Sequence, residues 1–350
     1  MTQALAPLDG QRPDLVGVFV SGADPDAVEA AGLRAMELAG ARTVVGCSAG
    51  GVIGNSRGVE HASAVSVFAA CLPGLRCTPF RLELLRTAEG VAVAGMPDRE
   101  EDDGVAILLV DPATFPVAAF LQRANDDFAG LAFTGGVASG HGYTGNARLF
   151  MDGEVVHGGA VGLLLGGDVT ARPVVSQGCR PFGPPMVVTK AEGNVLLELA
   201  GTPALTKLEQ IVAELDPGER QAVAHGLNIG VVMDEYAMEH ERGDFLIRPV
   251  VGADREQDAI AIGEVVEVGR TVRFQVRDAA AAEEDLDEMF AQFRTEAGRA
   301  GGALLFSCNG RGRAMFPSAD HDVLAVREGL GATGVAGFFA AGEIGPVAGR

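Results

Sequence analysis

Basic residues and tryptophan are scarce in this sequence. It contains no tryptophan, two tyrosines and 27 basic residues against 47 acidic ones, which gives a formal net charge of −20 at pH 7. No Lys/Arg cluster interrupts the acidic background, so a polyphosphate backbone would be repelled. The composition therefore predicts no binding to nucleic acid.

Cysteine and histidine are also few, and they lack a metal-binding pattern. The five cysteines show neither CxxC nor Cys/His spacing, and the six histidines form no HExxH motif or close HxH pair. We therefore expect reduced thiols and no bound metal.

Long apolar segments are missing as well. No stretch of about 18 apolar residues occurs without a charge or a breaker. The N-terminal residues MTQALAPLDGQRPD lack the basic and then apolar layout of a signal peptide. We expect neither membrane insertion nor secretion, and therefore a cytoplasmic protein.

Apolar residues and glycine are abundant. With 47% hydrophobic residues, a chain of 350 residues can bury the cores of two ordinary domains. Its 49 glycines are needed mainly where the backbone turns sharply or closely approaches another group. We therefore expect the functional residues to lie beside the glycine-rich loops.

The first half predicts two strand-then-helix segments separated by shorter strands. Buried strands are expected at 15–22 and 105–111, and each leads into a helix, the first beginning at Asp24-Pro25 and the second near Val117. Short apolar runs from Ala64 onward, without a long helix, indicate antiparallel strands.

The second half begins with a helix that the Thr202-Pro203 pair is expected to open. Further strands, a helix around Met289, a strand from Ala303 and a helix from about Asp320 follow. The prediction is a mixed α/β (α+β) protein with two consecutive domains, 13–199 and 200–350, built of largely antiparallel sheets with flanking helices. The recurring order of helix, strand and glycine suggests an internal duplication, although mixed folds also share this order generally.

Four segments carry a resemblance to a known family: GCSAGGVIG at 46–54, the segment 178–199, LLFSCNGRGRAMF at 304–316 and GFFAAGEIGPVAG at 337–349. Together they resemble the FIST family, from about Asp14 onward. The resemblance implies a FIST N-like domain at 13–199 and a FIST C-like domain at 200–350. It also implies a further strand beyond Arg350, so truncation of the C-terminal domain is left open.

The resemblance further implies a sensory protein of bacterial signal transduction. Such a protein binds a small molecule, with amino acids the usual suggestion, and passes the signal to a separate output protein. It supplies no agreed list of catalytic or ligand-binding residues, so the candidate residues below rest on their chemistry.

The first candidate loop is Gly46-Cys47-Ser48-Ala49-Gly50, which fits the G-x-S-x-G pattern of a nucleophile elbow. The Gly-Val-Ile-Gly run after it argues against the helix that an elbow requires. Ser48 and Gly50 are therefore expected in a tight turn whose backbone N–H groups bind a carboxylate or satisfy their own hydrogen bonds.

The second candidate loop, 307–313, leaves a buried strand and carries Cys308, Asn309, Arg311 and Arg313. A guanidinium binds a carboxylate through two hydrogen bonds, which suits an amino-acid or organic-acid ligand. Glu343 is expected to bind a ligand ammonium group or to pair with one of the two arginines. For the arginines, a plain ion pair is the alternative.

The third candidate loop, 135–142, offers Ser139 and His141. It has neither the GKS/T ending of a phosphate loop nor the order of a dinucleotide fingerprint. No cofactor and no catalytic residue is therefore predicted.

The ligand-binding prediction rests on seven residues: Ser48, Gly50, Ser139, Asn309, Arg311, Arg313 and Glu343. The alternatives are a hydrolase or transferase using Ser48 or Cys308, and a protein-interaction module without catalysis.

Overall fold

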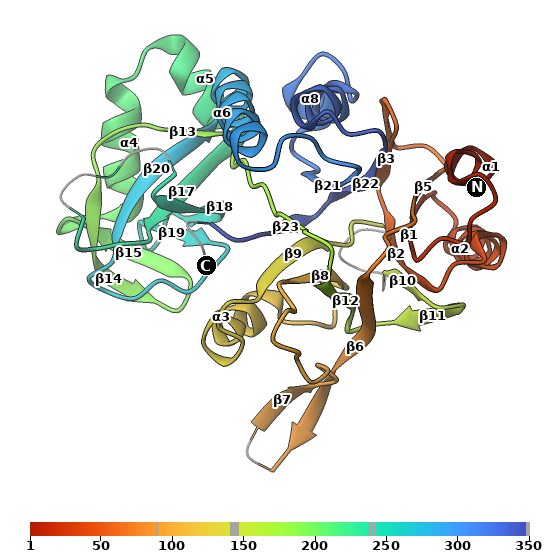
Figure 1. Cartoon of the computed structure of the whole chain (residues 1–350). Coiled ribbons are helices and arrows are strands. Elements are labelled where there is room, and N and C mark those ends of the chain that lie inside the picture. Colours follow the sequence, from red (N-terminus) through yellow and green to blue (C-terminus); the bar gives the residue numbers. More distant parts are fainter. Residues whose placement is uncertain (89, 141–146, 238–239, 241–242, 348–350) are drawn as a thin grey trace. The chain divides into compact units, whose positions relative to one another are not determined.

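The computed structural model describes residues 1–88, 90–140, 147–237, 240 and 243–347. The chain forms two compact units (Figure 1), one built from 1–175 together with 289–350 and the other from 176–288. The sequence division near Leu199 remains a prediction. The three C-terminal residues lie outside the described part, so the question of truncation after Arg350 stays open.

The first unit contains strands from both ends of the chain. Its elements are α1 (Thr2–Leu5), η1 (Ala6–Leu8), β1 (Leu15–Ser21), α2 (Pro25–Ala39), β2 (Thr43–Ala49), β3 (Gly51–Gly54), β4 (Arg57–Glu60), β5 (Ala64–Ala70), β6 (Leu75–Thr87), β7 (Gly90–Ala94), β8 (Val105–Val110), α3 (Val117–Asp127), β9 (Ala132–Val137), β10 (Arg148–Met151), β11 (Glu154–His157), β12 (Ala160–Gly167), β21 (Ala303–Cys308), α7 (Gly312–Met315), α8 (His321–Leu330), β22 (Val335–Ala340) and β23 (Gly342–Ile344).

Three strand–helix–strand units organise this part of the chain. Helix α2 connects the parallel strands β1 and β2, α3 connects β8 and β9, and α8 lies between β21 and β22. Strands β1, β2, β8 and β22 are buried along their whole length, as expected for apolar runs in parallel pairs. Helix α2 begins as predicted, since Asp24 accepts a hydrogen bond of 3.0 Å from the backbone N–H of Asp26.

Three sheets share one apolar core. Their strand orders are β11-β10-β2-β1-β5, β23-β9-β8-β12-β6-β7 and β21-β22-β3-β4. The ring of Phe19 from β1 stacks on Phe338 from β22 with centroids 5.2 Å apart, and Phe306 from β21 meets both rings edge-on. The C-terminal strands therefore complete a core that the N-terminal strands begin.

The second unit is largely antiparallel. Its elements are β13 (Cys179–Pro181), β14 (Met186–Glu192), β15 (Val195–Leu199), β16 (Thr202–Pro203), α4 (Ala204–Glu214), α5 (Pro217–Gly226), β17 (Leu227–Val232), β18 (Phe245–Asp254), β19 (Ala259–Ile262) and β20 (Thr271–Arg277), and α6 (Ala279–Ala297) leads from it back into the first unit. Six of the strands close into a ring in the order β14-β15-β19-β18-β17-β20, because β20 pairs with both β17 and β14. The ring gives each of these six strands two neighbours.

The first two helices of the second unit, α4 and α5, differ from the sequence prediction. Thr202-Pro203 pairs with β15 as a short strand, and α4 begins at Ala204. The cap comes from Asp258, which accepts a hydrogen bond of 3.1 Å from the backbone N–H of Thr206 and a second one from its hydroxyl. Helix α5 was not predicted, although its capping signal is local: Asp216 and Glu219 each accept a hydrogen bond from the other's backbone N–H.

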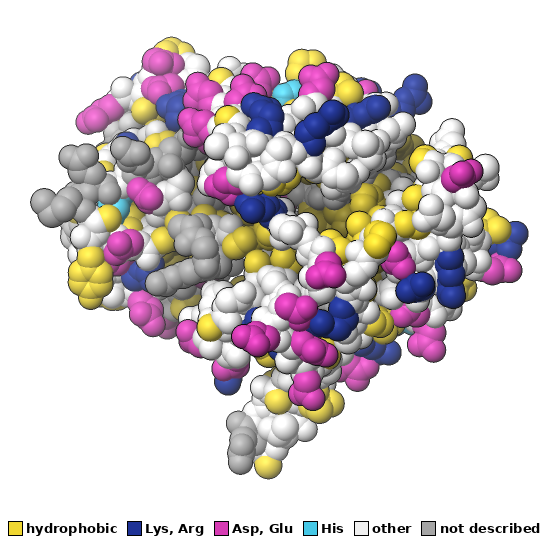
Figure 2. All heavy atoms as spheres, in the orientation of Figure 1, with side chains coloured by type: hydrophobic (Ala, Val, Ile, Leu, Met, Phe, Trp, Pro, Cys, Tyr) yellow, Lys and Arg dark blue, Asp and Glu magenta, His cyan; other side chains and the backbone are white. Residues whose placement is uncertain are grey.

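The predicted class, a mixed α+β protein, is confirmed by these sheets and helices. Figure 2 shows acidic side chains spread over the visible face, as the net charge of −20 predicts. Of the helices in the described ranges, none has the length and apolar character needed to span a bilayer.

Candidate functional site

Glycine-rich turns at the ends of β2, β9, β21 and β22 meet in the first unit. The backbone N–H of Gly50 donates a hydrogen bond of 3.0 Å to the hydroxyl of Ser139, which in turn donates to the backbone oxygen of Phe339. The N–H of Asn309 donates to the backbone oxygen of Ala340 over 2.8 Å. We call these five residues the loop junction. The structure thus brings together three candidate residues that lie far apart in the sequence, Gly50, Ser139 and Asn309.

Ser48 lies beneath the loop junction and is fully buried. Its hydroxyl oxygen accepts a hydrogen bond of 3.0 Å from the backbone N–H of Arg148, and a Cβ atom on Gly140 would approach that oxygen to 2.7 Å. The strand β3 follows the turn, so the strand–turn–helix context of a nucleophile elbow is absent. The neighbouring candidate His141 lies outside the described residues. As described, the Ser48 hydroxyl acts as a buried hydrogen-bond acceptor.

Arg311 forms a buried ion pair with Asp322 at the start of α8. Its Nε and Nη2 atoms lie 2.7 and 2.9 Å from the two carboxylate oxygens of Asp322, and the side chains of Arg311 and Asp322 are only 10% and 6% exposed. The hydroxyl of Ser307 donates a further bond of 2.7 Å, and the ring of His321 lies 3.0 Å away. Of the two alternatives for Arg311, the geometry favours the ion pair, because a ligand carboxylate would compete with Asp322.

The protonation of this pair follows from its contacts. Burial raises the pKa of Asp322, but the hydrogen bond and the charge of Arg311, with Ser307 and His321, outweigh it and lower the pKa to about 2. Burial has the opposite effect on Arg311 and lowers its pKa. The hydrogen bond and charge of Asp322, followed by the charges of Glu343 and Cys308, outweigh burial and raise the pKa above its ordinary value. Both residues are therefore charged near neutral pH.

Arg313 differs from Arg311 because its side chain is exposed. Its backbone N–H donates to Glu60 Oε2 over 3.2 Å at the start of α7, and the neighbouring Gly312 has a φ of +48°. A Cβ atom on Gly312 would lie 2.6 Å from Glu60 Oε1, which this flexible side chain can relieve, so it is the positive φ that favours glycine here. Among the described residues, the guanidinium of Arg313 has no hydrogen bond or ion pair.

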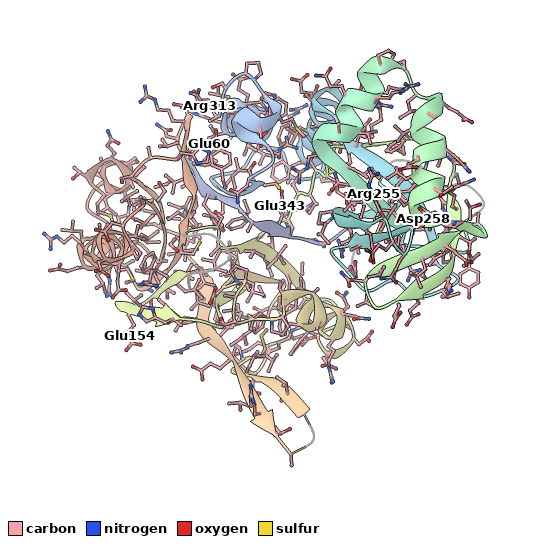
Figure 3. The ribbon with its side chains drawn as sticks, turned by 180° about the vertical axis from the view of Figure 1, so that it is seen from behind. Glu60, Glu154, Arg255, Asp258, Arg313 and Glu343 are labelled. Carbon is pink, nitrogen blue, oxygen red and sulfur yellow. The ribbon has the colours of Figure 1, made fainter. Side chains whose placement is uncertain are left out.

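Glu343 lies on β23 opposite Gly136 of β9, and its side chain is exposed. Its charge contributes to the raised pKa of Arg311, and its pairing with either arginine stays a prediction. Asn309 is also exposed, at the edge of the loop junction. Figure 3 labels Glu343, Arg313 and Glu60 on their elements.

Cys47 and Cys308, the cysteines of the first two candidate loops, differ in environment. Cys47 is fully buried in the core, and this burial raises the pKa of its thiol well above the ordinary value, which keeps it protonated and unreactive. Cys308 is half-buried, and its sulfur accepts a bond of 3.4 Å from the N–H of Gly310. In the described ranges, no group of three His, Cys, Asp or Glu side chains is placed to hold a metal ion.

Sequence reasoning missed two acids that hold these loops. Asp322 was overlooked as the partner of Arg311 because it belongs to the following helix. Asp111 comes directly after the buried strand β8 and is fully buried; it accepts bonds from the hydroxyl of Thr114, at 2.7 Å, and from the N–H of Ala147, at 3.4 Å. An acid at the exit of a fully apolar strand was the available signal for Asp111.

Comparison with known proteins gives the same family for both parts of the chain. Residues 14–202 match the FIST N domain, and residues 204–346 match the FIST C domain. An uncharacterized protein of Mycobacterium bovis is 44% identical over 350 residues, which cover 99% of this chain and 90% of that protein. An uncharacterized protein of Mycobacterium tuberculosis is 44% identical over 357 residues, which cover 100% of this chain and 88% of the relative. The chain therefore belongs to the FIST family, with a FIST N and a FIST C domain in succession.

Proposed function

We propose that this protein is a cytoplasmic sensor that binds a small carboxylate metabolite, such as an amino acid, beside the loop junction. FIST domains are sensory domains of signal transduction. In this proposal, binding changes the balance between two states of the protein, and a separate output protein responds to that change.

The observation that supports the proposal is the convergence of four glycine-rich turns. The ends of β2, β9, β21 and β22 are linked by the bonds among Gly50, Ser139, Phe339, Asn309 and Ala340. In sheets with parallel strands, ligands are usually held by the loops at the carboxyl ends of the strands. This arrangement favours ligand binding at the loop junction.

The exposed side chains indicate the chemistry of the ligand. Arg311 is engaged by Asp322, whereas Arg313, Asn309 and Glu343 are exposed. We assign the carboxylate of the ligand to Arg313 and its ammonium group to Glu343, with Asn309 as a hydrogen-bonding group. Ser48, Gly50 and Ser139 support the loops instead of touching the ligand, because their described hydrogen bonds are made within the protein.

Thermal unfolding against a panel of amino acids, organic acids and nucleotides tests this proposal. With a ligand at about 1 mM and a dissociation constant near 10 μM, the added stability is roughly 2.7 kcal/mol, or several degrees in Tm. We expect one chemical class to raise the Tm of the wild type and to lose this effect in Arg313→Ala and Glu343→Gln. Arg172→Ala, at an exposed ion pair of the same unit, is the control that should respond like the wild type.

Two outcomes would contradict the proposal. The first is the absence of a Tm shift with every compound class in the panel. The second is a shift that persists unchanged in both Arg313→Ala and Glu343→Gln. The first outcome favours the protein-interaction alternative, whereas the second shows that the ligand binds through residues other than Arg313 and Glu343.

A further inference from the structure

The hairpin of β6 and β7 extends beyond the sheet to which it belongs. Strand β6 pairs with β12 from Leu75 to Leu82, and from Glu83 onward it pairs only with β7. Figure 1 shows this hairpin projecting from the rest of its unit. A two-stranded ribbon is marginally stable in water by itself. The projecting part would therefore be stabilised by a further strand.

Three exposed aliphatic side chains lie on one face of the hairpin, beside Arg86. Leu84 lies opposite Val93 and Arg86 lies opposite Val91, so Leu84, Val91 and Val93 share this face with the arginine. Their exposed fractions are 37% for Leu84, 36% for Val93 and 66% for Val91. Figure 2 shows hydrophobic side chains on the hairpin. This concentration of exposed aliphatic groups favours contact with another protein surface.

The outer edge of β7 lacks the features that normally prevent strand pairing. Its sequence, GVAVA over Gly90–Ala94, contains no charged residue and no proline, and its pairing with β6 shows no bulge. Protein edge strands usually carry a charge, a proline or a bulge that prevents them from pairing with other chains. In a chain of net charge −20, this neutral strand also allows two copies to meet without like charges facing each other.

We propose that β7 is a dimerisation strand, which pairs antiparallel with β7 of a second copy around a twofold axis at Ala92. In this register Val91 of each copy lies opposite Val93 of the other, so the pairing joins aliphatic side chains twice. The two sheets become one continuous sheet through a self-complementary interface. Only five residues of each copy form the ladder, compared with about 20–30 in a standard interface, so the dimer is expected to dissociate in the micromolar range.

Sedimentation velocity over about 1–300 μM protein tests the dimer at concentrations around this range. We expect the wild type to shift from monomer to dimer and Val91→Lys to stay monomeric, because a lysine on the edge strand blocks pairing. The matched control is Val251→Lys, since Val251 is 60% exposed but lies on β18, outside the hairpin of β6 and β7; it should dimerise like the wild type. Melting curves would establish that all three proteins fold. A monomeric wild type throughout, or a dimer unaffected by Val91→Lys, would overturn the proposal.

Cysteine cross-linking tests the register independently. Directly opposed residues of an antiparallel pair have Cα atoms about 4.5–5.5 Å apart, within the range of a disulfide. Ala92→Cys should therefore form a covalent dimer under mild oxidation, whereas Ala129→Cys, at an exposed position after α3, should cross-link no more than the wild type. Equal cross-linking of the two variants would exclude the proposed twofold register.

Discussion

Replacing Arg311 tests whether this arginine stabilises the fold or binds a ligand. In Arg311→Met, the carboxylate of Asp322 keeps its buried position but loses the two hydrogen bonds of the guanidinium. Removal of one partner from a buried ion pair costs about 3–5 kcal/mol, because an uncompensated charge remains. We therefore expect the free energy of unfolding to fall by this amount at pH 7.

A matched control is available in the same unit. Arg172 and Glu296 form an ion pair of 2.7 Å whose side chains are 42% and 47% exposed. Since exposed pairs contribute at most about 1 kcal/mol, Arg172→Met should be nearly neutral. Both substitutions lie in the unit formed by 1–175 and 289–350, so both report on the unfolding of that unit.

Urea denaturation followed by far-UV circular dichroism is the appropriate assay, because the chain has no tryptophan and two tyrosines for intrinsic fluorescence. The double variant Arg311→Met with Asp322→Leu should recover most of the lost stability, since it removes both charges. If Arg311→Met costs no more than Arg172→Met, the ion pair is not structural and Arg311 returns as a ligand-binding candidate.

Three further predictions follow from individual contacts. The pKa of Asp322 in the folded protein, about 2, lies below its ordinary value of 3.8. The ionised carboxylate therefore contributes roughly 2 kcal/mol to the free energy of unfolding above pH 4, and this contribution is lost as the pH falls toward 2. Melting curves of Asp322→Asn should lack this acid-dependent loss. Gly32→Ala should destabilise the protein by about 1–3 kcal/mol, because its Cβ would lie 2.3 Å from an aromatic ring, while Gly104→Ala, with no atom within 4 Å, should have little effect. In alkylation at pH 8 followed by peptide mass spectrometry, Cys47 should react last and the partly exposed Cys71 much earlier; equal rates would contradict the burial of Cys47.

The sequence predicts local structure well where the apolar pattern is continuous. Strands β1 and β8 and helices α2 and α3 occur where hydrophobic runs and the Asp24-Pro25 pair place them. Pairing between distant segments has no such local signal. Nothing in the sequence of β3 indicates that it lies beside β22, and the ring of strands in the second unit also depends on distant partners.

The candidate site shows the same limit. Glycine-rich turns were expected to be important, and Gly50, Ser139 and Asn309 do lie in one hydrogen-bonded junction. The charged groups were harder to predict, because the partner of a buried arginine depends on packing. Glu343 was expected to bind a ligand ammonium group or to pair with Arg311 or Arg313, and Asp322, which makes the two short contacts with Arg311, was not foreseen.

The sheet that joins β3 and β4 to β21 and β22 cannot form during synthesis until β21 and β22 have been made. The partners of the N-terminal strands, including the ring of Phe338 that stacks on Phe19, emerge from the ribosome only after the whole second unit, 176–288, has been synthesised. At about 5–20 residues per second, the first strands wait for tens of seconds before this core can close. The nascent N-terminal segment therefore exposes apolar surface during that interval, and we expect it to depend on chaperone protection until the last strands arrive.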